Sequence, residues 1–329
     1  MKSAIKTVAR VLFFNPLFFF RTSFPVWYWI LNHEPRKKFR EMKLRQVAVT
    51  KRVLDDLLRD GIAVTSLEEL FPGQAMLQKL VAYADHLMPQ AKVRTGKPFL
   101  KALWEEDMTL ELSNPFMRLA LSDEVLSVIN GYMGMLAKFF FSALDLTLTV
   151  PENAERLRSQ NWHRDPDDKK MVKMFLYLSD VDEGSGPFTY IHGSHFGGKW
   201  ERVFPQDPPK GSYPETEEVT RRIPQEDVFI ATGKAGSVIF ADTAGLHRGG
   251  YAHTRERLMF TAEYSSKATL RPIRYRLGAR LTEELGDFSP AARYAVSKNF
   301  GWFAPLNALS FMAIKYGIYR NPTPHGERY

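Results

Sequence analysis

The 329-residue sequence predicts a mainly β fold with α additions, a sandwich or barrel that follows a helical N-terminal section. Helix-forming stretches dominate the first 135 residues, whereas from residue 138 onward short runs of strand formers alternate with Gly, Pro and Asp turns. All-β cores often use more than roughly 200 residues, so one domain with elaborations accounts for the whole length.

The first 40 residues form a hydrophobic and basic arm. Residues 11–31 are long and apolar enough to span a bilayer, but Arg21 lies at their middle and Pro16 and Pro25 interrupt a helix. The aromatic residues at 27–29 suit the interface between membrane and water, and no cleavage site of a secretory signal follows. We expect peripheral membrane contact, and an arm packed on the core, an oligomer-forming arm or a true span remain as alternatives.

Helices and one short strand are expected before the β-rich part. Residues 41–60 carry an apolar stripe at helical spacing and stop at Gly61, after which a strand is predicted over 62–64. Two more helices are predicted over 73–88 and 114–132.

The β-rich part carries six predicted strands. They cover residues 138–150, 172–179, 188–191, 227–230, 237–240 and 258–264. Residues 206–225 are polar and are expected to form a surface insertion that covers a pocket as a lid. Residues 276–329 are expected to be a helical, aromatic C-terminal extension whose apolar side chains join those of the arm.

The composition excludes several kinds of site. There is no cysteine, so disulfides, thiolate ligands and cysteine nucleophiles are absent, and any bound metal must use nitrogen and oxygen ligands. The formal charge is +8, but Lys and Arg are spread along the chain without a nucleic-acid-binding signature, so no nucleic-acid partner is expected. The expected location is the cytoplasm, where iron(II) is most easily kept reduced, with peripheral contact to the membrane.

Two histidines and one aspartate are candidate metal ligands. His163 and Asp165 are two residues apart, so on extended backbone both side chains point to the same face. His247 lies in Gly-Leu-His-Arg-Gly-Gly and could complete the set from another strand. Two imidazoles and one carboxylate suit non-haem iron(II) chemistry with oxygen. Arg257, ten residues beyond His247, could hold a dicarboxylate beside the metal.

Three segments extend this pattern. They are Asp-Gly-Ile-Ala-Val-Thr at 60–65, the acidic turn with Gly-Pro and Gly-Ser-His over 182–195, and Ala-Gly-Ser-Val-Ile-Phe-Ala-Asp leading to His247 over 235–250. Together they resemble the phytanoyl-CoA dioxygenase family of iron(II)- and 2-oxoglutarate-dependent oxygenases. The resemblance covers residues 60–264, and His192 stands where the family usually has proline.

The resemblance implies a double-stranded β-helix, also called a jelly roll, with His163, Asp165 and His247 as iron(II) ligands. We expect an oxygenase domain over 41–275, with a helical part over 41–135 and a β-helix core over 136–270. Arg257 would bind the distal carboxylate of 2-oxoglutarate, with Arg255 as a competitor. Gln160 is expected to face the cofactor. The implied activity is an oxidoreductase that uses O2 to hydroxylate a C–H bond and releases succinate and carbon dioxide.

The aromatic and basic termini favour a lipid-like or acyl-chain substrate. A soluble small metabolite is the alternative substrate. The same three ligands could instead hold a catalytic zinc ion in a hydrolase, or the fold could serve binding without catalysis. His192 and His195 are expected to close a turn by hydrogen bonding. Arg248 is expected either to contact the substrate or to stabilise its hairpin.

Overall fold

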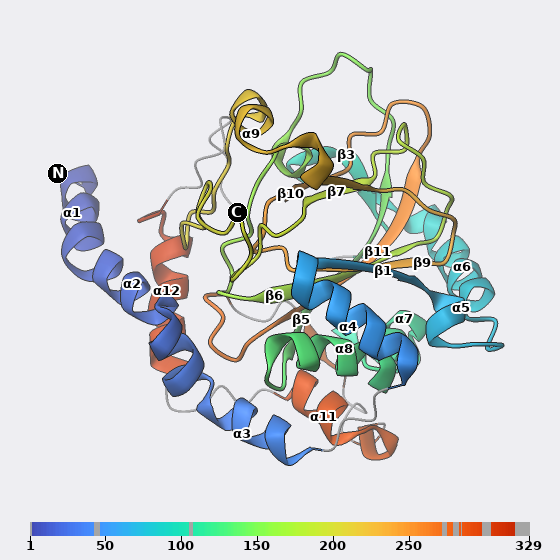
Figure 1. The fold of residues 1–329 in the computed structure, drawn as a ribbon, viewed down its shortest axis with the longest axis horizontal. Helices are drawn as coiled ribbons and strands as arrows, with labels where there is room; N and C mark the ends of the chain where they lie inside the picture. Colours follow the sequence, from blue (N-terminus) through green and yellow to red (C-terminus); the bar gives the residue numbers. More distant parts are fainter. Residues whose placement is uncertain are drawn as a thin grey trace.

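The computed structural model describes residues 2–42, 47–104, 108–271, 275–278, 283, 285–297 and 304–319. Two antiparallel sheets face each other, and helices cover the outer face of the larger one (Figure 1). In spatial order, the large sheet contains β1 (Ile62–Ser66), β9 (Ser237–Ala241), β6 (Met171–Tyr177), β11 (Arg257–Ser265), β5 (Lys138–Thr147), β3 (Lys97–Ala102) and β2 (Lys92–Arg94). The small sheet contains β10 (His247–Arg248), β7 (Phe188–Ile191) and β8 (Val228–Ala231). A parallel pair, β4 (Thr109–Leu110) and β12 (Arg276–Leu277), lies apart from both.

The helices of the central part are α4 (Ala48–Asp60), α5 (Leu67–Leu70), α6 (Met76–Leu87), α7 (Pro115–Ala120), α8 (Asp123–Met133), α9 (Thr216–Arg222) and α11 (Pro290–Val296). Short 3-10 turns are η3 (Met88–Gln90), η4 (Arg158–Gln160), η5 (Gln225–Asp227) and η6 (Leu285–Asp287). The predicted mainly β fold with a helical N-terminal section is confirmed.

Strand alternation divides the large sheet into a helix-facing side and an inner side. On β11, Leu258, Phe260, Ala262 and Tyr264 belong to the main hydrophobic core with the helices. The intervening side chains, including Met259 and Thr261, line a cavity between the two sheets. Because neighbouring side chains on a strand point to opposite faces, one strand builds both the core and the cavity wall.

Two parts of the expected helical section differ from the prediction. The helix predicted over 114–132 is two helices, because the Ser122 side chain accepts a hydrogen bond from Val125 N and caps α8. The hairpin of β2 and β3 also lies within this section, and it extends the large sheet beyond β5. No strand was predicted from the sequence at residues 92–102.

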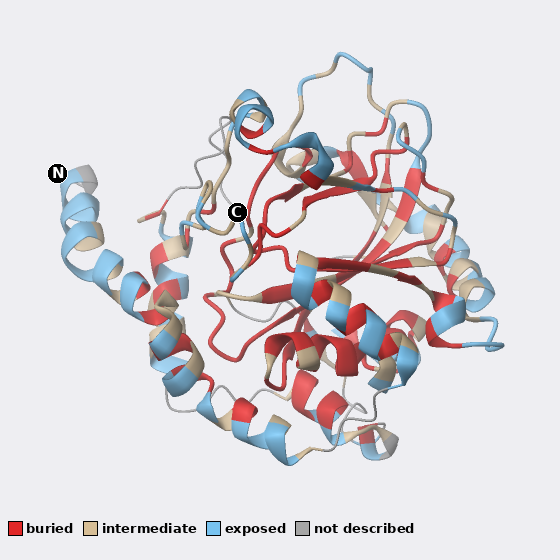
Figure 2. Cartoon of the chain, viewed as in Figure 1, coloured by how far each residue is buried: buried red, intermediate tan, exposed pale blue. Residues whose placement is uncertain are grey.

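The arm comprises α1 (Lys2–Ala9), η1 (Arg10–Phe14), α2 (Asn15–Thr22), η2 (Val26–Leu31) and α3 (His33–Glu41). Its anchor is Arg21, which is 1% exposed and donates hydrogen bonds to Ser310 Oγ at 2.5 Å and Ala268 O at 2.9 Å. Ser310 belongs to α12 (Ala304–Lys315), so α2 of the arm lies beside α12 (Figure 1). Much of the arm before Phe18 is exposed (Figure 2). Within the described residues, no helix is long and apolar enough to cross a membrane.

Candidate metal and co-substrate site

The candidate site opens into a cavity of about 1300 Å³ between the two sheets. Its wall contains His163 and Asp165 from the segment before β6, His247 from β10, and Arg257 from β11. The fold therefore brings four of the five predicted site residues to one cavity. The fifth, Gln160, is not among the residues that line it.

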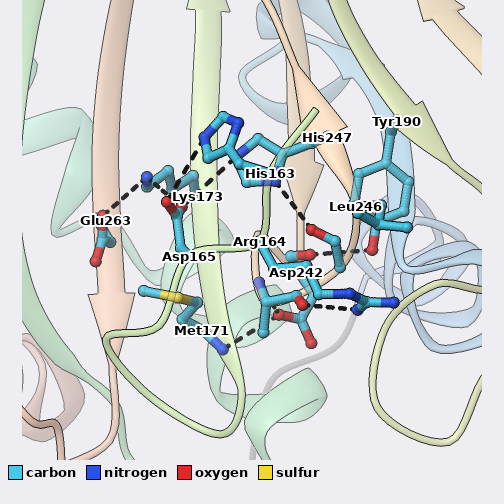
Figure 3. A network of polar contacts seen from close by, with 12 residues as sticks. His163, Arg164, Asp165, Met171, Lys173, Tyr190, Asp242, Leu246, His247 and Glu263 are labelled. Atoms are coloured by element: carbon cyan, nitrogen blue, oxygen red, sulfur yellow. Dashed lines mark hydrogen bonds and ion pairs between the residues drawn. The ribbon is translucent and has the colours of Figure 1, made fainter. Parts of the chain in front are cut away.

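Backbone bridges place the three candidate ligands. His163 and His247 exchange backbone hydrogen bonds of 2.9 and 3.0 Å, and Asp165 N donates to Thr243 O at 2.9 Å. The segment from His163 to Asp165 is thus held against the strand end that carries His247. With His163 and Asp165 on the same face of extended backbone, the three side chains converge (Figure 3).

The ligand atoms lie within reach of one ion. Nε2 of His163 is 3.8 Å from one Asp165 carboxylate oxygen, and Nε2 of His247 is 3.6 Å from the other. The three side chains each offer an atom within 4.8 Å of the others and could hold a metal ion. Such a set of two histidines and one carboxylate on adjacent positions leaves room for other ligands on the metal.

Backbone carbonyls orient both imidazoles. Nδ1 of His163 lies 2.9 Å from Asn161 O, and Nδ1 of His247 lies 3.0 Å from Gly245 O. A carbonyl can only accept, so each Nδ1 carries the proton and each Nε2 keeps its lone pair for a metal.

The electrostatics favour the ligand-competent protonation states. Burial lowers the pKa of His163 and lowers that of His247 well below its ordinary value. Burial alone would raise the pKa of Asp165, but the charge of Lys173 lowers it below its ordinary value. At neutral pH the carboxylate is therefore ionised and the imidazoles are neutral, as metal binding requires.

A lysine on β6 connects the aspartate to a second carboxylate. Lys173 Nζ lies 2.6 Å from Asp165 Oδ2 and 3.2 Å from Glu263 Oε2 (Figure 3). Lys173 and Glu263 are directly opposite each other on β6 and β11, and both line the cavity. The ion pair holds the Asp165 side chain at the base of the site.

The side chain of Arg164, between the candidate ligands His163 and Asp165, points to the opposite face of the backbone. Arg164 is 2% exposed and donates to the backbone oxygens of Phe204, Ser194, Ala244, Trp200 and Val203 at 2.5 to 3.1 Å. These oxygens belong to the long loop between β7 and α9 and to the turn that precedes His247. A buried guanidinium thus joins the ligand segment to its surroundings on the face away from the cavity (Figure 3).

The structure separates the two candidate arginines. Arg257 is 3% exposed, and its Nη2 donates to Thr147 Oγ1 at 3.3 Å. Its Nε and Nη1 have no hydrogen-bond partner among the described residues. Arg255 is on the surface, with 59% of its side chain exposed, and lies 3.9 Å from Asp182. Of these two arginines, Arg257 lines the cavity of the ligand cluster and Arg255 does not.

Gln160 has a different place from the one expected. Its Oε1 accepts from Leu157 N at 2.8 Å, and its Nε2 donates to Gly250 O at 2.9 Å. The side chain thus secures the η4 turn against the strand end after His247, and no contact of Gln160 supports the expected cofactor role.

His192 and His195 lie outside the cluster. His195 Nε2 is 3.3 Å from Leu58 O, and the His192 ring stacks on Phe229 with centroids 5.1 Å apart. Neither belongs to the group of described residues that could share a metal.

Sequence reasoning missed two contributors to the wall. Tyr213, from the polar insertion, stacks on the His163 ring with centroids 5.7 Å apart. Glu263 could have been found from the sequence. It is six residues after Arg257, so on a strand both side chains point to the same face, and a carboxylate is unexpected on an apolar strand. No comparable signal marks Tyr213, because its insertion has no periodic pattern.

No protein-family model matches the chain, and no curated protein matches it. Several solved structures match the chain. The non-heme alpha ketoglutarate dependent carbocyclase SnoK from nogalamycin biosynthesis is 14% identical, with a TM-score of 0.50 over 76% of this chain and 94% of its own. The epimerase SnoN, solved with Fe3+, alpha ketoglutarate and nogalamycin RO, is 18% identical, with a TM-score of 0.49 over 67% and 84%. EctD from S. alaskensis, solved with 2-oxoglutarate and 5-hydroxyectoine, is 17% identical, with a TM-score of 0.48 over 72% and 90%.

At such identities the similarity shows the fold alone. The carbocyclase match, together with the two facing sheets, confirms the predicted jelly-roll core. The finer resemblance to the phytanoyl-CoA dioxygenase family stays a prediction.

Proposed function

We propose that this protein is an iron(II)- and 2-oxoglutarate-dependent dioxygenase. The observation that carries the proposal is the shared cavity, where two histidines and an aspartate converge and the buried guanidinium of Arg257 has two N–H donors without partners. A buried cation with unused donors is costly unless a ligand supplies acceptors. A dicarboxylate that reaches from the metal to Arg257 would supply them.

The residues fit both groups. His163, Asp165 and His247 would hold iron(II) through two Nε2 atoms and a carboxylate oxygen, and carbonyl groups already fix the required tautomers. Arg257 would bind the distal carboxylate of 2-oxoglutarate through a pair of charge-assisted hydrogen bonds. When bound, the two groups supply the oxidation of a C–H bond by O2, with release of succinate and carbon dioxide.

The chain's own part in the reaction is to bind and orient. Thr147 accepts from Arg257 Nη2 and so holds the guanidinium in place. Lys173 and Arg164 hold the ligand segment from its two faces. The cavity walls place the substrate beside the three ligands, and this positioning is the protein's usual contribution to cofactor chemistry.

For the substrate we propose a lipid-like or acyl-chain molecule that is hydroxylated. The support is an apolar wall formed by Phe99, Phe140, Phe175, Phe188 and Met259 in a cavity of about 1300 Å³. Ligand pockets commonly measure roughly 300 to 1000 Å³, so the cavity has space for a long substrate besides the small co-substrate. A soluble metabolite is favoured instead if the protein without residues 1–40 stays soluble and fully active.

We also propose that the arm contacts a membrane surface. The support is its exposed apolar side chains, such as Leu12 at 75% and Phe19 at 80% exposure, next to the basic Lys6 and Arg10. Flotation with anionic vesicles tests this contact. The double variant Leu12→Glu, Phe19→Glu should stay in solution, whereas Leu58→Glu, which changes an exposed leucine outside the arm, should float like the wild type. Equal flotation of all three proteins would refute the contact.

An anaerobic titration of the metal-free protein with iron(II) and then 2-oxoglutarate tests the enzyme class. The expected result is the weak visible charge-transfer band of iron-bound 2-oxoglutarate, lost in His163→Ala and kept in His192→Ala, which removes a histidine outside the cluster. Iron binding without the band would favour a hydrolase or a binding protein. Hydrolytic activity of the metal-free protein after zinc is added in place of iron(II) would identify a hydrolase.

A further inference from the structure

The wall of the cavity carries more positive than negative charge. It contains eight Lys and Arg side chains and four Asp and Glu side chains. The charges of iron(II) and the 2-oxoglutarate dianion would cancel each other, so the excess persists when both are bound. A cavity with such an excess attracts anions.

One partly buried cation of this wall is Arg248. Arg248 follows the candidate ligand His247 and lines the cavity. Its guanidinium lies over the Trp162 ring, 4.5 Å from the ring centre, and is attracted to the face of the ring. Among the described residues, the Arg248 side chain makes no hydrogen bond and no ion pair, so this side chain does not secure the hairpin by polar contacts.

A second arginine of the cavity wall, Arg158, belongs to the η4 turn, whose backbone is bonded to the residue after Arg248. Gly249, next to Arg248, donates from its N to Ser159 O at 2.9 Å, and Ser159 is next to Arg158. Arg158 lines the cavity and has a φ of 50°, a conformation that side-chain-bearing residues seldom adopt. The Gln160 hydrogen bonds described above hold this turn, and strained backbone of this kind is typical of binding sites.

Arg156, from the same segment, adds to the positive field. Its guanidinium stacks on Tyr251 at 3.9 Å and donates to Gln160 O at 3.4 Å. Burial, and then the charge of Arg156, lower the pKa of Arg248 to about 10, so Arg248 is still a cation at neutral pH. Cations gathered in this way repel one another unless an anion joins them.

We propose that Arg248 and Arg158 bind an acidic group of the substrate, a carboxylate or a phosphate, so the substrate is an organic anion with an apolar body. The inference rests on the proposed function, because it treats the same cavity as the substrate site. The acidic group lies beside β10, and the apolar body lies along the wall formed by Phe99, Phe140, Phe175 and Phe188, toward the ligand cluster.

Calorimetric titration of the full chain with decanoate, decyl phosphate and decan-1-ol tests this site. The titrations are made under nitrogen with iron(II) and saturating 2-oxoglutarate, so that Arg257 is already occupied, and are repeated without these additions. At least one acid should bind about 10-fold or more tightly than the alcohol, because a charge-assisted hydrogen bond is lost in the alcohol. The acid that binds distinguishes a carboxylate from a phosphate.

Arg248→Gln should abolish the preference for the acid, and Arg255→Gln, which changes an exposed arginine outside the cavity, should keep it. Circular dichroism and thermal melting check that the variants are folded, and Arg158→Gln replaces Arg248→Gln if the latter fails to fold. Equal binding of acid and alcohol by the wild type, binding of none of the three compounds, or an unchanged preference in Arg248→Gln overturns the proposal. A missing charge-transfer band with an intact acid preference would overturn the proposed function and leave the anion site standing.

Discussion

Replacing Arg257 by glutamine separates a ligand-binding role of this residue from a structural one. The guanidinium is buried, and its Nε and Nη1 have no partner among the described residues. If both donors bind the distal carboxylate of 2-oxoglutarate, the variant loses two charge-assisted hydrogen bonds. Two such bonds contribute about 3 kcal/mol or more, which corresponds to a loss of affinity of at least about 100-fold.

The same variant should not lose stability without ligands. A buried donor without a partner costs about 1 to 3 kcal/mol, and glutamine removes the charge that has to be buried. The free energy of unfolding of metal-free Arg257→Gln should therefore equal or exceed that of the wild type.

Two measurements test the predicted loss of 2-oxoglutarate affinity and the predicted free energy of unfolding. The charge-transfer band reports the dissociation constant of 2-oxoglutarate, and urea denaturation of the metal-free protein reports the free energy of unfolding. Arg255→Gln should match the wild type in both, because Arg255 is exposed and outside the cavity. A change in affinity below about 10-fold, or a metal-free variant destabilised by more than about 2 kcal/mol, would refute the reasoning.

Three further predictions concern the surroundings of the site. Lys173→Met leaves the buried Asp165 without its cation, so the metal-free protein should lose about 3 to 5 kcal/mol in urea denaturation, and iron(II) should restore more stability than it adds to the wild type. Equal stabilisation of both proteins by iron(II) would contradict this. Arg164→Lys keeps the charge but replaces a guanidinium with hydrogen bonds of 3.1 Å or less to five backbone oxygens, and we expect a loss of about 2 to 4 kcal/mol by the same assay, whereas Arg221→Lys on the surface should change little. Hydrogen bonds from Lys267 and then Lys38 lower the pKa of Glu34 from 4.5 to about 2. Its contribution to stability is therefore present above pH 4.5 and lost as the pH falls toward 2, so the difference in melting temperature between the wild type and Glu34→Gln should shrink over that window.

Local patterns predicted much of the fold. The strands at 172–179, 188–191, 237–240 and 258–264 form close to their expected bounds, because each is a short apolar or alternating run bounded by turn residues. The hairpin at 92–102 was missed because Lys92, Arg94, Lys97 and Lys101 give its short strands no apolar run. The partner that orders this hairpin is β5, more than forty residues away in the chain.

The sequence by itself determined the candidate ligand set and which side chains of an extended segment share a face. His163 and Asp165 share a face because they are two residues apart, and Arg257 shares a face with Met259 for the same reason. Only the tertiary structure decided which arginine enters the cavity, because Arg255 and Arg257 have the same parity and differ only in where the strand begins. The same holds for the charge of the cavity: Arg158 and Arg248 are ninety residues apart in the chain, and the backbone bond from Gly249 to Ser159 joins the two segments that bring them to one cavity wall. Spacing along a strand is a local property, whereas the contacts of a cavity wall depend on which distant segments pair.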